Sequence, residues 1–367
     1  MERPPVGALE SDCVIGGKAM SQPQPIDPRY SRHTLFSPIG ENGQRKLSAS
    51  RVAIVGMGAL GAVLANHMVR AGVGFVRLID RDFVESSNLQ RQMLYDEEDA
   101  AQSAPKAVAA AQRLGRINSL VTIEPHVADL NPLNAETLLG GVDLILDGTD
   151  NFAVRFLVND VSNKLNIPWI YGGAVASRGV SMTIIPGKTP CLRCLFPQAP
   201  ASGTAETCDT AGVIGGIIHV VASYQAAEAL KLLVGDTLHL STSMQQWDLW
   251  YNQYSAIDVA KARRPDCPAC ASQRFDYLNA ELEGETIQSL CGRNTVQILP
   301  LQPSAIPLDQ WEQRLRPLGP LERNRFLLKF QPNAETTLVI FPDGRVLVQG
   351  TDDVTHAKSL YSRYIGM

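Results

Sequence analysis

The chain has 367 residues, of which 45% are hydrophobic, and a formal net charge of -4. This length and composition permit a large buried core and are typical of two or three domains. With a pI near 5.9, the chain lacks the overall positive charge that attracts nucleic acid, so any anion site must be built from local cations.

Residues 1–28 show neither a helix nor a strand pattern, and organised sequence begins near "RYSRHTLF". We expect a flexible N-terminal extension there. Glu2, Arg3 and two prolines stand where a secretory signal would need a basic segment followed by an apolar one. We therefore expect a cytoplasmic protein.

Strand and helix patterns alternate through the first half of the chain. Short apolar runs at 51–56 ("RVAIVG"), 75–80 ("FVRLID") and 142–147 ("VDLILD") predict buried strands, and the segments 59–72 and 105–118 have helical periodicity. This order predicts an α/β fold, a doubly wound, Rossmann-like and mostly parallel sheet. We assign it to residues 29–275, with further strands in "PWIYGGAV" and "GVSMTIIP".

A glycine turn joins the first strand to its helix. Gly56, Gly58 and Gly61 in "GMGALG" occupy the G-x-G-x-x-G positions, which let a phosphate approach the N-terminus of a helix. Asp80 ends the second strand, where it can accept hydrogen bonds from ribose hydroxyls. The pattern indicates a nucleotide but leaves a dinucleotide oxidoreductase open, as well as a turn that binds nothing.

The polar run "SSNLQRQMLY" at 86–95 favours a triphosphate. Asn88 and Arg91 lie in this run, and Lys106 begins the following helix, so two cations can meet phosphates near Asp80. A nicotinamide enzyme has no evident use for such a cluster. The alternative is a solvated polar loop, which is what most runs of this composition are.

A second acidic site follows the strand at 142–147. Asp150 and Asn151 in "DGTDN" stand at the carboxyl end of that strand, which is the usual ligand crevice of an open α/β sheet. A carboxylate there can hold Mg²⁺. We therefore predict that Asp150 organises a magnesium ion.

Seven cysteines and no export signal argue against a disulfide framework. Four of them form two C-x-x-C pairs, "CLRC" and "CPAC". Two such pairs complete the four-sulfur shell of structural zinc, with no open position for catalysis. A redox C-x-x-C or coincidence is the alternative. The predicted zinc ligands are Cys191, Cys194, Cys267 and Cys270.

The longest apolar stretch, at 211–235, is interrupted by His219, Ser223, Tyr224 and Gln225 before it reaches the length of a membrane span. We expect a buried helix and no membrane association. Just before it, Cys208 lies in a small, polar run that leads into this helix. A thiol that is exposed near a helix N-terminus has a lowered pKa and is reactive, but a structural role is equally open.

Seven segments together resemble the ThiF/MoeB/HesA family, the bacterial relatives of ubiquitin-activating enzymes. The resemblance covers about residues 29 to 272, and its motifs are "RYSRHTLFSPIG", "GMGALG", "SNLQRQ", "PKAVAA", "GTDNFAVRF", "PGKTPCLRC" and "CDTAGVIGG". Within the family the chain is most similar to ThiF-type thiazole biosynthesis adenylyltransferases, because "LCGRNTVQI" and "DGRVLVQGT" also look like theirs. These lie in a segment at 285–367, which we expect to form a small C-terminal α+β domain.

The resemblance implies an ATP- and Mg²⁺-dependent nucleotidyltransferase that adenylates the C-terminal glycine of a ubiquitin-like sulfur carrier, in thiamine thiazole biosynthesis. It implies that Asp80 holds the ribose, that Asn88, Arg91 and Lys106 hold the phosphates, and that Asp150 organises magnesium and the reacting carboxylate.

The resemblance also implies a homodimer in which Arg32 reaches the partner's ATP, and a sulfur donor such as a cysteine desulfurase or rhodanese-type protein. Cys208 matches a cysteine that joins the activated carrier or takes part in sulfur transfer in some relatives. Arg155 either supports the site or forms a salt bridge on its helix. An ordinary surface role for Arg32 stays open, because quaternary structure decides it.

Other functions remain open at this stage. The same chemistry can serve a MoaD-like carrier in molybdopterin synthesis, a tRNA-thiolation carrier or a peptide. An NAD-dependent oxidoreductase would need a hydride site, which is not evident. A protein that only binds a ubiquitin-like partner would lose the cations or Asp150, and this chain keeps them.

Overall fold

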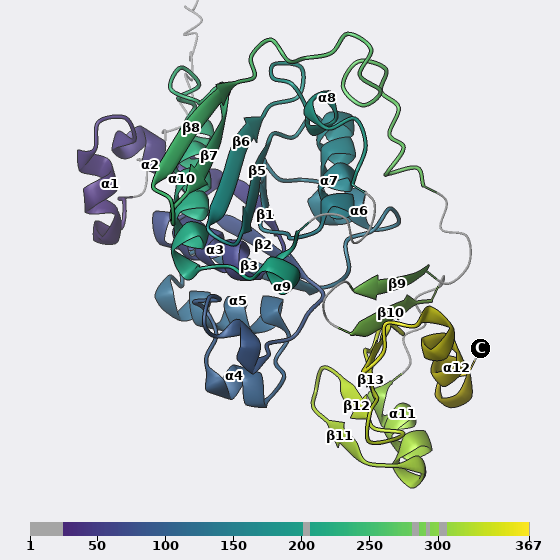
Figure 1. The fold of residues 1–367 in the computed structure, drawn as a ribbon. Coiled ribbons are helices and arrows are strands. Elements are labelled where there is room, and N and C mark those ends of the chain that lie inside the picture. Colours follow the sequence, from purple (N-terminus) through teal and green to yellow (C-terminus); the bar gives the residue numbers. More distant parts are fainter. Residues whose placement is uncertain (1–24, 201–205, 281–285, 291–293, 301–306, 367) are drawn as a thin grey trace, which may run out of the picture.

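The computed structural model describes residues 25–200, 206–280, 286–290, 294–300 and 307–366. Residues 1–24 of the expected N-terminal extension lie outside this range, as do Cys13 and Cys291. The described chain forms a large domain built on an eight-stranded sheet and a smaller domain built on a six-stranded sheet (Figure 1).

The large sheet has the strand order β3-β2-β1-β4-β5-β6-β7-β8. The five strands from β3 to β5 are parallel, and β6, β7 and β8 continue the sheet in antiparallel pairs. Their bounds are β1 Arg51–Val55, β2 Phe75–Asp80, β3 Thr122–Val127, β4 Leu144–Asp147, β5 Trp169–Val175, β6 Arg178–Ile184, β7 Ser243–Asp248 and β8 Gln253–Asp258. The predicted doubly wound, mostly parallel sheet is confirmed.

Helices cover both faces of this sheet, which explains why the central strands are apolar on both sides. One face packs against α2 (Gly40–Ala49), α3 (Ala59–Ala71), α5 (Lys106–Ile117) and α10 (Gly215–Val234). The other packs against α6 (Ala135–Leu139), α7 (Phe152–Leu165) and α8 (Leu192–Leu195). Short helical segments complete the domain: η1 Pro28–Tyr30, α1 Ser31–Leu35, η2 Ser86–Asn88, α4 Glu97–Ala101 and α9 Cys208–Ala211.

Helix α10 is the apolar segment that the sequence predicts to be a buried helix. By length and composition it would be able to cross a membrane. Its buried residues, which include Ile217, Val221 and Ala226, join the core beside β5, β6 and α3. Packing inside the large domain therefore accounts for its apolar character.

The smaller domain is an antiparallel sheet with the order β11-β12-β13-β14-β10-β9 and two helices. Its strands are β9 Thr286–Leu290, β10 Thr295–Leu299, β11 Leu321–Arg323, β12 Leu328–Phe330, β13 Thr337–Ile340 and β14 Val346–Gln349. Its helices are α11 Leu308–Leu315, followed by η3 Arg316–Leu318, and α12 Val354–Tyr364. Apolar side chains from the sheet, α11 and α12 form a separate core, so the expected C-terminal α+β segment is present.

Candidate functional site

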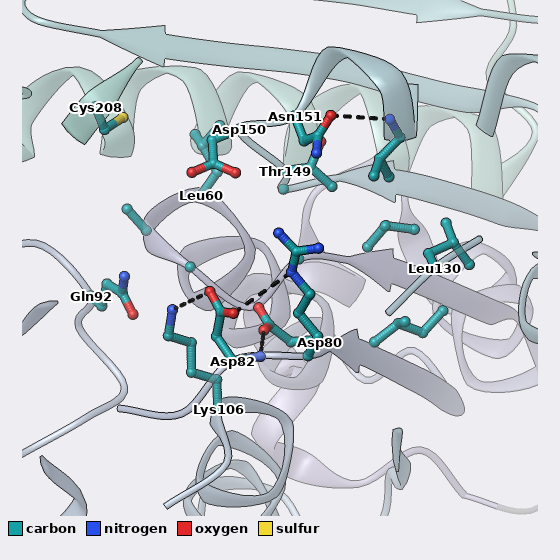
Figure 2. A pocket seen from close by; sticks show the side chains of 18 of the residues that line it. Leu60, Asp80, Asp82, Gln92, Lys106, Leu130, Thr149, Asp150, Asn151 and Cys208 are labelled. Carbon is teal, nitrogen blue, oxygen red and sulfur yellow. Dashed lines mark hydrogen bonds and ion pairs between the residues drawn. The ribbon is translucent and has the colours of Figure 1, made fainter. Parts of the chain in front are cut away.

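The candidate site lies at the carboxyl ends of β1, β2 and β4. The chain runs outward from β1 to β2 and β3 on one side and reaches β4 and β5 on the other, so β1 and β4 flank the topological switch point. A pocket opens there (Figure 2). It is lined by eight of the residues predicted from the sequence: Gly56, Gly58, Asp80, Arg91, Lys106, Asp150, Asn151 and Cys208.

Three glycines allow the backbone to pack closely at the turn after β1. Gly56 has a φ of +85°, and a Cβ there would lie 2.9 Å from the backbone of Gly148. A Cβ on Gly61 would lie 1.8 Å from the carbonyl oxygen of Gly56. The turns after β1 and β4 therefore touch backbone to backbone. Gly58 is the N-cap residue of α3 and provides no side-chain cap. The N–H groups at the start of this helix are therefore available to bind an anion.

Asp80 ties the end of β2 to the glycine turn. One carboxylate oxygen accepts from the backbone N–H of Met57 at 2.5 Å, and the other accepts from that of Asp82 at 2.6 Å. Burial raises the pKa of Asp80 above its ordinary value, and the nearby Lys106 ammonium opposes this effect. The carboxylate lines the pocket as predicted, with both oxygens already engaged by the backbone.

Two cations predicted from the sequence line the pocket, one held by a carboxylate and the other by a backbone carbonyl. Lys106 is buried, and its Nζ lies 3.3 Å from a carboxylate oxygen of Asp82. Arg91 is half-buried and donates to the carbonyl oxygen of Ser87 at 2.9 Å. Both predicted cations therefore line the pocket, and Figure 2 shows Lys106 across it from Asp150.

Sequence reasoning missed Arg81, Asp82 and Asp129, which also line the pocket. Arg81 Nη1 lies 2.8 Å from a carboxylate oxygen of Asp129. Burial disfavours the charged guanidinium, but Asp129 and Asp82 outweigh it and raise the pKa of Arg81. The signal was available, because these residues directly follow β2 and β3 as Asp150 follows β4.

Asn88 is not among the residues that line the pocket. Its side chain is buried, accepts from the N–H of Glu85 at 3.1 Å and lies 3.5 Å from the hydroxyl of Ser87. These bonds shape the turn that carries Arg91 and Gln92. A direct contact between Asn88 and phosphate stays a prediction.

Two predicted residues have different surroundings. Arg32 is exposed on α1 and does not line the pocket of its own chain. Arg155 is buried, and its Nε lies 2.9 Å from a carboxylate oxygen of Asp147. Its Nη2 donates to the carbonyl oxygens of Thr149 and Gly172. Burial opposes the charge of Arg155, but Asp147 raises its pKa above the ordinary value.

Asp150 and Asn151 have separate surroundings although they are adjacent. Asn151 caps α7, because its side-chain oxygen accepts from the N–H of Ala153 at 2.8 Å. Figure 2 shows Asp150 directed toward the side of the pocket that holds Asp82 and Lys106. A carboxylate in this position can bind a cation that also contacts phosphates.

Cys208 is half-buried at the first position of α9, with its sulfur 3.3 Å from the carbonyl oxygen of Ala174. A second cavity of about 850 Å³ adjoins the pocket and is lined by β5, β6, β7 and β8. Three residues line both spaces, namely Asp150, Ala174 and Cys208. The predicted thiol therefore stands where the two spaces meet.

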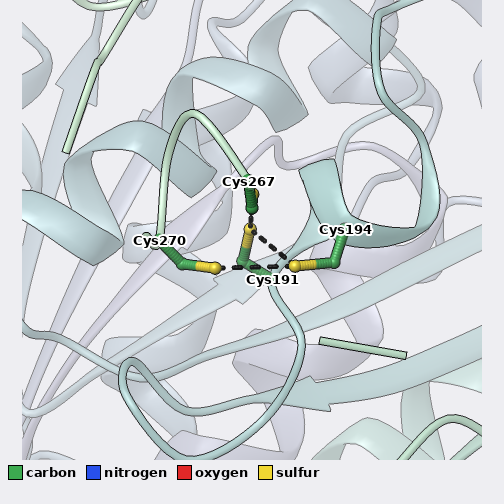
Figure 3. A group of neighbouring side chains, drawn as sticks. All are labelled: Cys191, Cys194, Cys267 and Cys270. Atoms are coloured by element: carbon green, nitrogen blue, oxygen red, sulfur yellow. Dashed lines mark hydrogen bonds between the residues drawn. The ribbon is translucent and has the colours of Figure 1, made fainter. Parts of the chain in front are cut away.

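The four cysteines of the C-x-x-C pairs form one cluster (Figure 3). The sulfur atom of Cys191 lies 3.6 Å from that of Cys267 and 3.9 Å from that of Cys194, and Cys194 and Cys270 are 3.5 Å apart. Tetrahedral zinc with bonds of about 2.3 Å spaces its sulfurs about 3.8 Å apart. The donors, their burial and their spacing fit a closed metal site, which joins the chain after β6 to the segment after β8.

Comparison with known proteins finds one family and several similar proteins. The model of the ThiF family matches residues 30–269. The chain is 42% identical over 339 residues to the sulfur carrier protein ThiS adenylyltransferase of Bacillus subtilis (strain 168), covering 92% of this chain and 99% of that protein. It is 38% identical over 250 residues to the sulfur carrier protein adenylyltransferase of Thermus thermophilus, covering 67% and 91%. E. coli MccB, solved with ATP, has the same fold with a TM-score of 0.58 at 23% identity, covering 67% of this chain and 75% of that chain.

Proposed function

The chain belongs to the ThiF family, and from this premise and the geometry of its pocket we propose that it adenylates the C-terminal carboxylate of a ubiquitin-like sulfur carrier protein. It is a nucleotidyltransferase, and ATP is the nucleotide. The expected cytoplasmic location remains part of the proposal.

The reaction joins two anions. A carboxylate oxygen attacks the α-phosphorus of ATP, a C–O–P mixed anhydride forms, and the bond from the α-phosphorus to the β-phosphate breaks with departure of pyrophosphate. Catalysis of such a step consists mainly of positioning and charge stabilisation. The N-terminus of α3 and the cations Arg81, Arg91 and Lys106 supply the positive charge.

We assign Mg²⁺ to the same pocket. Asp150 is the ligand that the sequence predicts, and it lies across the pocket from Lys106. A magnesium ion bound there would offset the charge of the phosphates during attack. Asp80 is assigned to the ribose, in keeping with its place at the end of β2.

The observation that carries the proposal is the meeting of two spaces at Asp150. The nucleotide pocket alone fits many nucleotide-binding proteins. The adjoining cavity of about 850 Å³ gives a polypeptide tail a path along β5 and β6 to the same carboxylate. A carrier terminus that enters this way reaches the α-phosphate and the thiol of Cys208 together.

A thiazole-forming pathway is favoured by the length of one match. Only 285 residues precede β9, so the 339-residue match with the ThiS adenylyltransferase must extend into the C-terminal domain. The Thermus match spans 91% of that protein with only 67% of this chain. We therefore propose a ThiS-like carrier, and a molybdopterin carrier, a tRNA-thiolation carrier or a peptide as the alternatives.

The remaining parts of the proposal concern metal and partners. Zinc is the metal we propose for the cysteine cluster, in a structural role. We propose a homodimer in which Arg32 serves the partner's site, and a sulfur donor of the desulfurase or rhodanese type that acts after adenylation. Cys208 is the residue assigned to capture of the activated carrier.

Exchange of labelled pyrophosphate into ATP tests the proposal. We expect exchange that requires Mg²⁺ and a carrier ending in Gly-Gly. We expect no oxidation of NADH by the same protein. The matched control is the same carrier without its terminal glycine. Equal exchange with both carriers would show that the terminal carboxylate is not the group activated.

A further inference from the structure

The C-terminal domain contacts segments that line the nucleotide pocket. Phe83, two residues after Arg81, is only 6% exposed because it inserts into an apolar cluster of the smaller domain. The partners of Phe83 are Leu327, Val339, Phe341 and Leu347. The segment that follows β2 therefore contributes to the packing of both domains.

Gln297 on β10 reaches a carboxylate of the pocket. Its side chain is fully buried, and its amide nitrogen donates to a carboxylate oxygen of Asp129 at 2.9 Å. The other oxygen of Asp129 accepts from Arg81 at 2.8 Å. Gln297 thus fixes the carboxylate that in turn fixes a pocket cation.

Arg345 bonds to the backbone of the same residue, Arg81. Its guanidinium is fully buried, stacks on the ring of Phe341 at 3.7 Å, and donates to the backbone carbonyl oxygen of Arg81 at 2.7 Å. That carbonyl lies between Asp80, assigned to the ribose, and Asp82, which binds Lys106. One bond from Arg345 therefore restrains the centre of the polar segment.

A stabilising role alone gives a poor account of Arg345. Removing a guanidinium from water is costly, and apolar side chains of similar volume often replace buried ionic groups without loss of stability. Among the residues that the structure describes, its Nη1 and Nε have no hydrogen-bond partner, and Nε has only a long ion pair with Asp343 at 3.9 Å. Burying the Arg345 guanidinium is therefore unfavourable for folding. Its hydrogen bond to Arg81 places a donor and a positive charge against the segment that lines the pocket.

We infer that the C-terminal domain is part of the nucleotide site, and that Gln297 and Arg345 are positioning residues that act through Asp129 and Arg81. The inference rests on the proposed function, because it assigns these residues to the binding of ATP. It gives the C-terminal domain a role in the adenylation reaction, on the side of the pocket away from the carrier cavity.

Two substitutions test this in the full chain. Gln297→Leu and Arg345→Met keep the approximate volume and remove the donors to Asp129 and Arg81. Each removes one hydrogen bond to a group of the pocket, so we expect the KM for ATP in pyrophosphate exchange to rise about tenfold. The KM for the carrier should change less than twofold. Arg345→Lys, which keeps the charge, should lie between the wild type and Arg345→Met.

The matched control is Val348→Ala on β14. Val348 is buried in the separate core of the smaller domain, whereas its neighbour Leu347 contacts the Phe83 cluster. This variant should lose stability but keep the KM for ATP within twofold. A rise in the KM for ATP equal to that of Arg345→Met would overturn the inference, since it would make stability the cause.

Two further measurements define the route of the effect. If Gln297 acts through Asp129, the effects of Gln297→Leu and Asp129→Asn on the KM for ATP will not add, and additive effects would contradict this route.

Hydrogen exchange of the backbone amides at 81–84 should also accelerate in both positioning variants and not in Val348→Ala. This readout needs no ATP. A wild type without exchange activity would refute the proposed function, and unchanged amide protection in the variants would refute the positioning link.

Discussion

The buried pair formed by Arg155 and Asp147 supplies a prediction whose size follows from the structure. The two side chains are 5% and 1% exposed, and Arg155 also donates to the carbonyl oxygens of Thr149 and Gly172. Arg155→Met leaves the carboxylate of Asp147 buried without its counter-ion, which typically costs about 3–5 kcal/mol. At roughly 2–4 °C per kcal/mol for a domain of this size, the Tm should fall by about 6–20 °C.

The assay is denaturant unfolding of Arg155→Met, of Asp147→Asn and of the double variant. Because Asp147→Asn removes the charge that Arg155 neutralises, the double variant should lose less stability than the two single variants added together. Arg178→Met is the matched control, since that arginine is exposed on β6 and its ion pair with Glu206 should contribute at most about 1 kcal/mol. A loss of under about 1 kcal/mol in Arg155→Met would refute the reasoning from burial.

Three more predictions concern the site and its supports. Asp150→Ala and Arg91→Ala should each lower pyrophosphate exchange by about 10²–10³ with unchanged circular dichroism, and near-normal exchange in both would remove them from the site. Cys267→Ser should lose its bound metal and its stability together, as metal analysis and denaturant unfolding will show. Cys208→Ala should keep both its metal and its pyrophosphate exchange. A sulfur-transfer assay should show that this variant fails only in thiocarboxylate formation. Burial raises the pKa of Asp160 from 3.8 to about 6. Its contribution to stability is therefore present below about pH 4 and is lost as pH rises through 6. Asp160→Asn stays neutral, so its stability should be close to that of the wild type near pH 4 and exceed it increasingly as pH rises to 7. A stability difference that stays constant between pH 5 and 7 would contradict this.

Local chemistry made much of the nucleotide pocket predictable. Gly56 and Gly61 follow from a turn that leaves no room for side chains. Asp80 and Asp150 follow from the rule that ligands bind at the carboxyl ends of parallel strands. The same rule, applied to every strand, would have found Arg81 and would have pointed to Asp129 after β3.

Other features depend on side-chain direction, which the sequence does not determine. The contact of Asn88 with phosphate stays a prediction, and its side chain is buried against its own turn, because an asparagine in a polar loop can bond to backbone as readily as to a ligand. Gln297 and Arg345 act across 168 and 264 residues of chain. No local pattern indicates such contacts, so the role of the C-terminal domain emerges only from the fold.

The turn after β4 shows how the carboxylate of Asp150, which we propose as a magnesium ligand, is held among several polar neighbours. Asp147 accepts from Arg155 and from both the N–H and the hydroxyl of Thr149. Asn151 accepts from the N–H groups at the start of α7. These bonds fix the backbone on both sides of Asp150, and its carboxylate lines both the nucleotide pocket and the adjoining cavity. Because a fixed turn presents the carboxylate in one place, the proposed reaction needs no further ordering of Asp150 when ATP and the carrier terminus bind.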